Sequence, residues 1–259
     1  MMSYLLKNIE FFSLVIVAST ALICFVIEQF VPMHTRTIKQ NINNTFFNIF
    51  FGTVSIFLSY IGISYVEVYA IKIQPFASLQ NLDLVTQIVL CILIFDILTW
   101  SLHVMNHRFS FLWRWHSVHH SDLLLNTSSA IRFHTIEIFY SAVVHSIFIA
   151  LTGFPIAVVL IYRTFFIVSN MFQHSNILLP YGLESKLAWF VVTPRYHHRH
   201  HSVVHVEQNS NFGSIFVFWD KLFLPRTQLS KIQFNYGLEP LQRKMNTLGL
   251  FFLPFKKKV

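Results

Sequence analysis

The chain has 259 residues, of which 54% are hydrophobic, 17% are aromatic and only 12% are charged. This charged fraction is about half that of soluble globular proteins, and with such hydrophobicity it excludes an intrinsically disordered chain. The two cysteines, Cys24 and Cys91, both lie in apolar runs, which excludes a disulfide scaffold. The net charge of +8 forms no basic stripe on a polar chain, so nucleic-acid binding is not needed to explain it. The composition is typical of an integral membrane protein.

Three apolar stretches are each near the ~20 residues that a helix needs to cross the hydrocarbon core of a bilayer. They cover residues 11–27, with apolar character running on to Pro32, then residues 40–66, and then residues 84–102, where Asp96 is the one charged residue. The first stretch lacks the small-residue cleavage site of a secretory signal. We therefore expect three transmembrane helices, the first of them retained.

A fourth apolar region, residues 138–171, is interrupted by Gly153-Phe154-Pro155. A glycine closely followed by a proline ends one helix and begins the next. The two helices, of about 15 and 17 residues, would be roughly 22 and 25 Å long, slightly short for a full crossing. We expect a helical hairpin with both ends on one side of the membrane, within an all-α membrane protein that carries a His-rich helical cytosolic cap.

Lysine and arginine residues predict the orientation. Sixteen of the 19 lie in the loop 33–44 or after residue 102, two lie on the opposite side, and Arg163 lies within the hairpin. The positive-inside rule then places the histidine-rich side in the cytoplasm, at the bacterial inner membrane or the ER membrane. We divide the chain into N-terminal membrane helices at 1–82, a His-rich region at 83–230 and a basic tail at 231–259 that contains Lys256-Lys257-Lys258.

The 14 histidines are the main chemical feature, because most of them lie in clusters at helical spacing. An H-x-x-x-H motif ends the third helix, and two H-x-x-H-H motifs follow in WRWHSVHHSD and TPRYHHRHHS. Residues at i, i+3 and i+4 share a helix face. With one histidine at the end of the hairpin, the candidate metal ligands are His103, His107, His116, His119, His120, His174, His197, His200 and His201. We interpret His34, His145 and His205 as ordinary structural or surface residues, and His198 as facing away from its neighbours.

Nine ligands exceed the six that an octahedral ion takes, so the count predicts two metal ions. Both cysteines lie inside apolar runs and supply no thiolate. The few carboxylates, Asp122, Glu137 and Asp220, suit hydrogen bonds to the second ring nitrogen of a ligand histidine. An imidazole site suits iron, zinc or copper, and the sequence does not choose among them by affinity.

A dinuclear site at the mouth of membrane helices can meet a lipid chain in the bilayer. Three functions fit: oxidation of a lipid C–H bond with O₂, metal-dependent hydrolysis, and non-catalytic metal or lipid binding. Hydrolysis usually needs a carboxylate base such as that of H-E-x-x-H, which the sequence lacks. Oxidation needs a metal pair that reduces O₂ inside an apolar shell.

Residues 88–224 resemble the fatty acid hydroxylase/sterol desaturase superfamily of membrane di-iron oxygenases. The resemblance is carried by the order and intervals of the three histidine motifs and by LWRWHSVHHSD, RFHTIE, FQHSN and NFGSIFVFWDKLF. The flanking residues look most like bacterial sterol-desaturase-type and alkylglycerol-monooxygenase-type members. Thr135 and Leu224-Pro225 depart from the usual Pro and Gly-Thr of the family, and neither departure removes a ligand.

The resemblance implies that the nine histidines bind two Fe²⁺ ions, with Zn²⁺ able to substitute in purified protein, and that residues 83–230 are the catalytic domain. It also implies supporting roles beside the ligands for Asn170 and Asp220, and for His134 either such a role, which we prefer, or a place as a tenth ligand. Asp96 shares a helix stripe with His103 and His107 and is a further candidate for a supporting role. The implied activity is hydroxylation or desaturation of a lipid or sterol with O₂. Because the sequence shows no haem, flavin or G-x-G-x-x-G motif, we expect electrons from a separate partner such as cytochrome b5 or a ferredoxin with its reductase, docked on the basic cytosolic face.

Overall fold

The computed structural model describes residues 2–70, 79–224, 234–238 and 245–256. Some of the sequence expectations lie outside these residues: Lys72, Pro225, the boundary at 230/231, and Lys257-Lys258 of the basic tail. Within the described part the fold is helical, and its extended pairing is limited to isolated bridges such as Pro32 with Ile177. The predicted fold class is confirmed.

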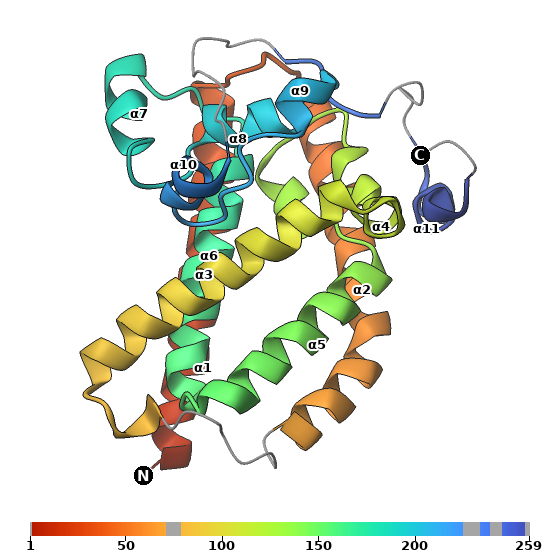
Figure 1. The fold of residues 1–259 in the computed structure, drawn as a ribbon. Helices are drawn as coiled ribbons and strands as arrows, with labels where there is room; N and C mark the ends of the chain where they lie inside the picture. The colour runs from red at the N-terminus through yellow and green to blue at the C-terminus, as the bar shows by residue number, and fades with distance from the viewer. Residues whose placement is uncertain (1, 71–78, 225–233, 239–244, 257–259) are drawn as a thin grey trace.

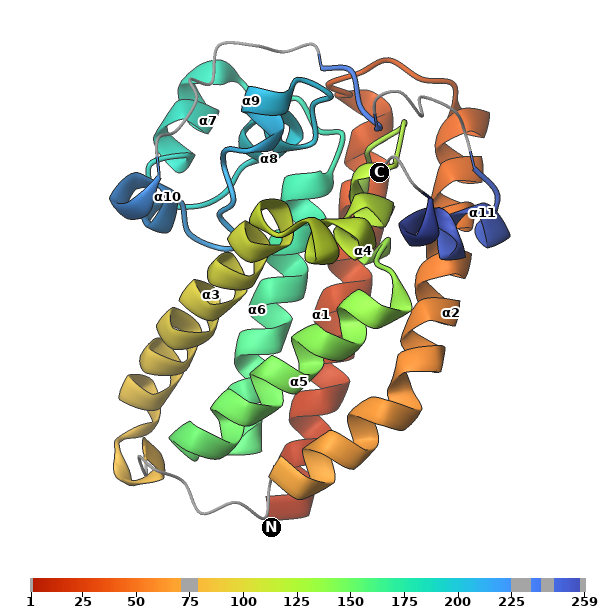
Figure 2. The same ribbon diagram turned by 45° about the vertical axis from the view of Figure 1, so that its right-hand side comes forward.

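Five helices in the described residues are long and apolar enough to cross a membrane. Figure 1 and Figure 2 show them running together from the end near the N-terminus towards a cap of short helices. Helix α1 packs against α6, α2 against α5, and α3 against α6 and the first cap helix. The five helices are α1 (Met2–Phe30), α2 (Ile38–Ala70), α3 (Leu84–Arg108), α5 (Thr135–Thr152) and α6 (Ile156–His174).

Helices α5 and α6 form the predicted hairpin. Gly153 caps α5 with a positive φ of 66°, a conformation that glycine adopts without steric penalty, and Pro155 stands at the N-cap of α6. The two helices have 18 and 19 residues, longer than the sequence pattern indicated, because their first or last turns are polar. The turn lies at the end of the bundle away from the cap, so both outer ends of the hairpin reach the cap side (Figure 2).

The cap lies over one end of the bundle and is built from short helices and the loops between them (Figure 1). Its first helix, α4, follows directly after α3 and crosses the bundle. The described cap elements are α4 (Ser110–His120), η2 (Thr127–Ile131), α7 (Tyr181–Leu187), α8 (Pro194–His200), α9 (His205–Gln208), α10 (Phe218–Phe223), α11 (Thr247–Phe251) and η3 (Leu253–Phe255). A further short helix, η1 (Leu79–Asn81), precedes α3.

Buried carboxyl groups connect the membrane helices to the cap. Asp96, on α3, accepts hydrogen bonds from the backbone N–H groups of Ile215 and Phe216 and from the indole N–H of Trp219. Glu28, near the end of α1, accepts hydrogen bonds from Thr127 and from the backbone N–H of Asn176. A carboxyl group inside an apolar bundle is stable only when such donors surround it. These contacts hold the cap in one position over the bundle.

Candidate metal centre

The structure brings all nine predicted ligands into two adjacent buried groups. In each group, one candidate ligand atom from every histidine lies within 4.8 Å of the others. The five-histidine group contains His103, His107, His116, His120 and His200. The four-histidine group contains His119, His174, His197 and His201.

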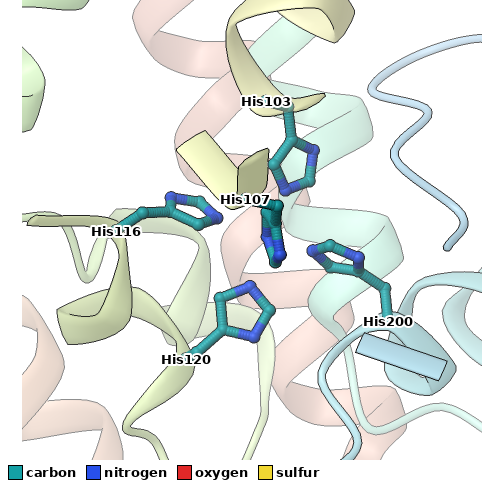
Figure 3. Close-up of side chains that lie close together, drawn as sticks. All are labelled: His103, His107, His116, His120 and His200. Atoms are coloured by element: carbon teal, nitrogen blue, oxygen red, sulfur yellow. The ribbon is translucent and has the colours of Figure 1, made fainter. Parts of the chain in front are cut away.

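The five-histidine group combines side chains from three helices. His103 and His107 come from the last turns of α3, His116 and His120 from α4, and His200 from the end of α8. Figure 3 shows the five rings arranged around a common centre. Every one of these side chains has an Nε2 atom that is buried and has no protein hydrogen-bond partner. Five lone Nε2 atoms in one buried space are expected where a cation binds, since an unpaired buried polar atom is otherwise destabilising.

In the four-histidine group, the Nε2 atoms themselves converge. The Nε2 atom of His174 lies 3.0 Å from that of His119 and 3.0 Å from that of His197, which in turn lies 3.1 Å from the Nε2 atom of His201. Two nitrogens that bind one ion at ~2.1 Å lie about 3.0 Å apart at right angles and about 3.4 Å apart in a tetrahedron. The observed separations therefore fit a single shared ion.

The two H-x-x-H-H motifs each serve both groups. In the first motif the i and i+4 residues, His116 and His120, belong to the five-histidine group, while His119 belongs to the other. In the second motif the division is reversed, because His197 and His201 join the four-histidine group and His200 joins the five-histidine group. Helices α4 and α8 thus lie on opposite sides of the centre and each presents nitrogens to both groups.

Hydrogen bonds on the second ring nitrogen fix the orientation of several of these side chains. The Nδ1–H of His116 donates to Oε1 of Glu137 at 2.6 Å, as the sequence predicted for one of the carboxylates. The Nδ1–H groups of His103, His174 and His200 donate to backbone carbonyls. A donor role for Nδ1 leaves the lone pair on Nε2, the atom that points into each group.

The backbone carbonyls that orient these rings were not predicted, because a carbonyl carries no residue signature. They belong to Phe212 for His103, Asn170 for His174 and Ser210 for His200. Two of them flank Asn211, whose φ of 59° reverses the chain between them. An asparagine followed by Phe-Gly is a weak signal for such a turn, and the sequence alone does not connect the two carbonyls to histidines that lie 10 and 109 residues away.

The residues expected beside the ligands occupy several positions. Asp220 accepts hydrogen bonds from the indole N–H of Trp100, the hydroxyl of Tyr196 and the backbone N–H groups at 212 and 213, so it holds the loop that orients His103. Asn170 acts on His174 through its backbone carbonyl, and its side-chain amide donates to the carbonyl of Ala130.

His134 and Asp96 act at a distance from the nine ligands. His134 is the N-cap of α5: its Nδ1 accepts the N–H of Ile136, and its Nε2 lies 3.3 Å from the carbonyl of Phe251. The residue thereby fixes the start of the helix that carries Glu137. The carboxyl group of Asp96 accepts hydrogen bonds from the backbone N–H groups of residues 215 and 216 and from the indole N–H of Trp219. The structure gives both residues a role in placing elements around the centre.

His198 lies outside both groups, as its position in the motif predicts. Its Nε2–H donates to the backbone carbonyl of His174, and its Nδ1 lies 2.6 Å from the hydroxyl of Tyr236. That hydroxyl also lies 2.6 Å from Nε2 of His34. His198 and His34 therefore join the segment around Tyr236 to the end of α6, which is a structural role.

Burial favours the neutral form of five ligand imidazoles of the cap. It lowers the pKa of His119, His120, His197 and His201 well below the usual value, and the nearby histidines lower it further. For His200, burial lowers the pKa to about 3. Neutral imidazole is the form that binds metal ions. The donor set, the unpartnered nitrogens and their protonation state all fit two metal ions of the borderline type that imidazole prefers.

A cavity of about 160 Å³ lies beside the two groups. Residues of α3, α5 and α6 line it from the bundle, and the loop at 213–214 lines it from the cap. His103 and His116 of one group and His119, His174 and His197 of the other form part of its wall. A molecule in this cavity would therefore lie next to both candidate metal sites.

Comparisons with known proteins agree with this centre. The model of the family described as fatty acid hydroxylase matches residues 88–224, a range that includes all nine histidines. The chain is 29% identical over 219 residues to the ornithine lipid hydroxylase OlsE of Rhizobium tropici, covering 80% of this chain and 65% of that protein. It is 27% identical to the alkylglycerol monooxygenases of Caenorhabditis elegans and Homo sapiens, over 52% and 47% of this chain and 26% of each of those proteins. The chain thus spans less than two thirds of the length of these relatives. No solved structure matches it significantly.

Proposed function

The chain belongs to the fatty acid hydroxylase family, and on this premise we propose that it oxidises a C–H bond of a membrane lipid with O₂ at a pair of iron ions. The strongest support is the convergence of nine histidines in two buried groups beside a cavity lined by membrane helices. The relatives named for hydroxylation of an ornithine lipid and for oxygenation of alkylglycerols support a lipid substrate.

We assign one metal ion to each histidine group. The five-histidine group offers five Nε2 atoms. The four-histidine group offers four, and neighbouring Nε2 atoms in it already lie about as far apart as two nitrogens that bind one ion. When bound, a pair of iron ions supplies the O₂-reducing chemistry that an unactivated C–H bond requires. Glu137 and the three backbone carbonyls hold four of these ligands, His103, His116, His174 and His200, in fixed tautomers.

The remaining work of the chain is positioning and the exclusion of water. The cavity places a substrate segment beside both groups, and Phe133, Ile138 and Phe166 give it apolar walls. The cavity, of about 160 Å³, can take the part of a lipid around the reacting carbon. Close placement of that carbon is worth several kcal/mol of the barrier.

The charge distribution supports a cytoplasmic cap and an external electron donor. The Lys and Arg pattern of the sequence favours a cytoplasmic cap, and among the described cap residues Arg114 and Lys186 are exposed. A basic surface attracts an acidic electron carrier such as cytochrome b5 or a ferredoxin and raises its rate of encounter. We therefore propose that electrons arrive at the cap from a separate protein.

The test combines metal analysis with isotope labelling. Full-length protein, loaded anaerobically with Fe²⁺, should bind about two ions per chain, and with ¹⁸O₂, a reductant and a lipid panel it should yield a product one ¹⁸O heavier, or a desaturated product. Substitution of His107 by Gln should abolish turnover, whereas the same change at the exposed His205 should leave turnover intact. Product formation without O₂, or a product that takes up ¹⁸O only in a parallel assay with H₂¹⁸O, would instead identify a hydrolase.

A further inference from the structure

Two residues that line the cavity each carry a buried hydrogen-bond acceptor without a protein partner. The acceptors are Oε1 of Gln173, on α6, and Oε2 of Glu137, on α5. Gln173 is 2% exposed and Glu137 is 4% exposed. Both residues line the cavity beside the histidine groups. Nothing in the metal-ligand arrangement uses these two oxygen atoms.

The orientation of the Gln173 amide follows from its neighbours. The backbone carbonyl of Ala130 can only accept, so the Nδ2 atom of Asn170, 2.9 Å away, is a donor. The Oδ1 atom of Asn170 is then an acceptor, and it lies 3.0 Å from Nε2 of Gln173. The network therefore directs the amide nitrogen of Gln173 towards Asn170 and leaves its oxygen as the unpartnered atom.

The two oxygen atoms of the Glu137 carboxyl group also differ in their hydrogen bonding. Its Oε1 atom accepts hydrogen bonds from Nδ1–H of His116 and from Nδ2–H of Asn106. The amide of Asn106 is itself fixed, because its oxygen accepts the hydroxyl of Tyr140. Both of these donors are engaged by Oε1, and Oε2 has no hydrogen-bond partner.

From these two oxygens we infer that the substrate carries hydrogen-bond donors, hydroxyl or amide N–H groups, close to the carbon that is oxidised. This inference rests on the proposed function and specifies its substrate class: an amphiphile with a polar donor near the reacting carbon, in contrast to the middle of a plain hydrocarbon chain. Phe133, Ile138 and Phe166 in the same cavity suit the adjoining apolar segment.

The preference follows from the cost of unpaired acceptors. Leaving a buried acceptor without a partner costs about 1–3 kcal/mol of free energy. A methylene chain packed against both oxygens offers no donor, so this cost would remain. A ligand with donors removes it. Sites built in this way reject analogues that lack the donor more strongly than they reject analogues that differ by a methylene group.

The test measures binding to the full-length, metal-free protein in nanodiscs, so that it does not depend on turnover. Two tritiated pairs are compared: 1-O-dodecylglycerol with its dimethyl ether, and N-methyldodecanamide with N,N-dimethyldodecanamide. We expect at least one donor-bearing member to bind about 10- to 100-fold more tightly than its capped partner. The pair with the larger ratio distinguishes hydroxyl from amide donors.

Two variants locate the effect. Gln173→Met keeps the length of the side chain without its acceptor and should reduce the ratio about 10-fold. Glu137→Gln should retain Oε1 towards His116 and place an NH₂ group where Oε2 was, so that binding shifts towards the capped, acceptor-only probes. Equal affinity within both pairs, or ratios unchanged in both variants, would overturn the inference. Because no oxidation is measured, such a result is distinct from failure of the ¹⁸O₂ assay.

Discussion

At the scale of single residues, neighbours in the sequence belong to different histidine groups. His119 and His120 are adjacent on α4, yet their ring planes differ by 84° and they belong to different groups. Consecutive residues on an α-helix point about 100° apart, so α4 can lie between the two groups and supply both. The H-x-x-H-H spacing predicts that these histidines are ligands, but it does not show which of the two groups each histidine joins.

We predict that alanine at these two positions weakens different sites. His120→Ala removes one nitrogen from the five-histidine group, and His119→Ala removes one from the four-histidine group. After loading with metal and removal of the excess, each variant should retain about one ion per chain, whereas the unsubstituted protein should retain about two. Elemental analysis gives the stoichiometry, and Co²⁺ absorption spectra identify the site that remains. Identical spectra for the two variants would contradict the assignment of the residues to separate groups.

At the scale of elements, the loop between α9 and α10 supports the centre as much as the ligand helices do. Its carbonyls at 210 and 212 orient His200 and His103, and Asp220 holds its backbone N–H groups. The turn depends on Asn211, which has a φ of 59° and donates to the carbonyl of Tyr196. Asparagine tolerates this left-handed conformation better than other non-glycine residues.

Substitution of Asn211 should therefore depend on backbone conformation more than on side-chain polarity. Asn211→Val should lower the free energy of unfolding by about 2 kcal/mol or more, because a β-branched residue is strained at positive φ, and it should release metal. Asn211→Gly relieves the strain and loses only the side-chain hydrogen bonds, so it should retain most of its metal. Thermal unfolding and metal content measure both effects. Comparable losses in the two variants would place the importance of Asn211 in its side chain.

Some features of the fold and of the site can be predicted from the sequence and others cannot, for a physical reason. The membrane helices, the break at Gly153 and the nine histidines are encoded locally, by apolar length, by a helix terminator and by i, i+3, i+4 spacing. The division of the ligands into groups, the carbonyls of the Asn211 turn and the capping role of His134 depend on how distant segments pack. No local pattern in the sequence carries that information.

At the scale of the whole molecule, the metal centre depends on contacts between the bundle and the cap. Oε1 of Glu28 accepts three hydrogen bonds, from the N–H and hydroxyl of Thr127 and from the N–H of Asn176, two residues after His174. Removing this acceptor leaves buried donors unpaired. A residue on the first membrane helix therefore influences a ligand at the end of the fifth.

We predict that Glu28→Leu destabilises the protein by about 2–5 kcal/mol and lowers its metal content, although Glu28 contacts none of the nine ligands. Glu28→Gln keeps an oxygen for the three donors and should stay close to the unsubstituted protein. Unfolding in detergent, followed by circular dichroism, provides the comparison. If the two variants behaved alike, the negative charge would matter and the hydrogen bonds would not.

The burial of so many imidazoles also predicts how stability depends on pH. Burial lowers the pKa of six cap histidines, so in the folded, metal-free protein they resist protonation at pH values where the unfolded chain, with pKa values near 6.5, takes up protons. These six are His119, His120, His197, His198, His200 and His201. The unfolded state then binds more protons below about pH 6.5, and the free energy of unfolding falls as the pH decreases, by up to ~1.4 kcal/mol per pH unit for each histidine.

The unfolding temperature of chelator-treated protein should accordingly be nearly constant from pH 8 to 7 and should drop steeply between pH 6.5 and 5. Replacing the exposed His205 by Gln should leave this slope unchanged, because folding does not bury this side chain. Replacing the buried His198 by Gln should make the slope shallower, because one fewer proton is taken up on unfolding. A midpoint that is flat or rises on acidification would mean that the folded cap protonates its histidines at least as readily as the unfolded chain does, and it would contradict the lowered pKa values of the buried rings.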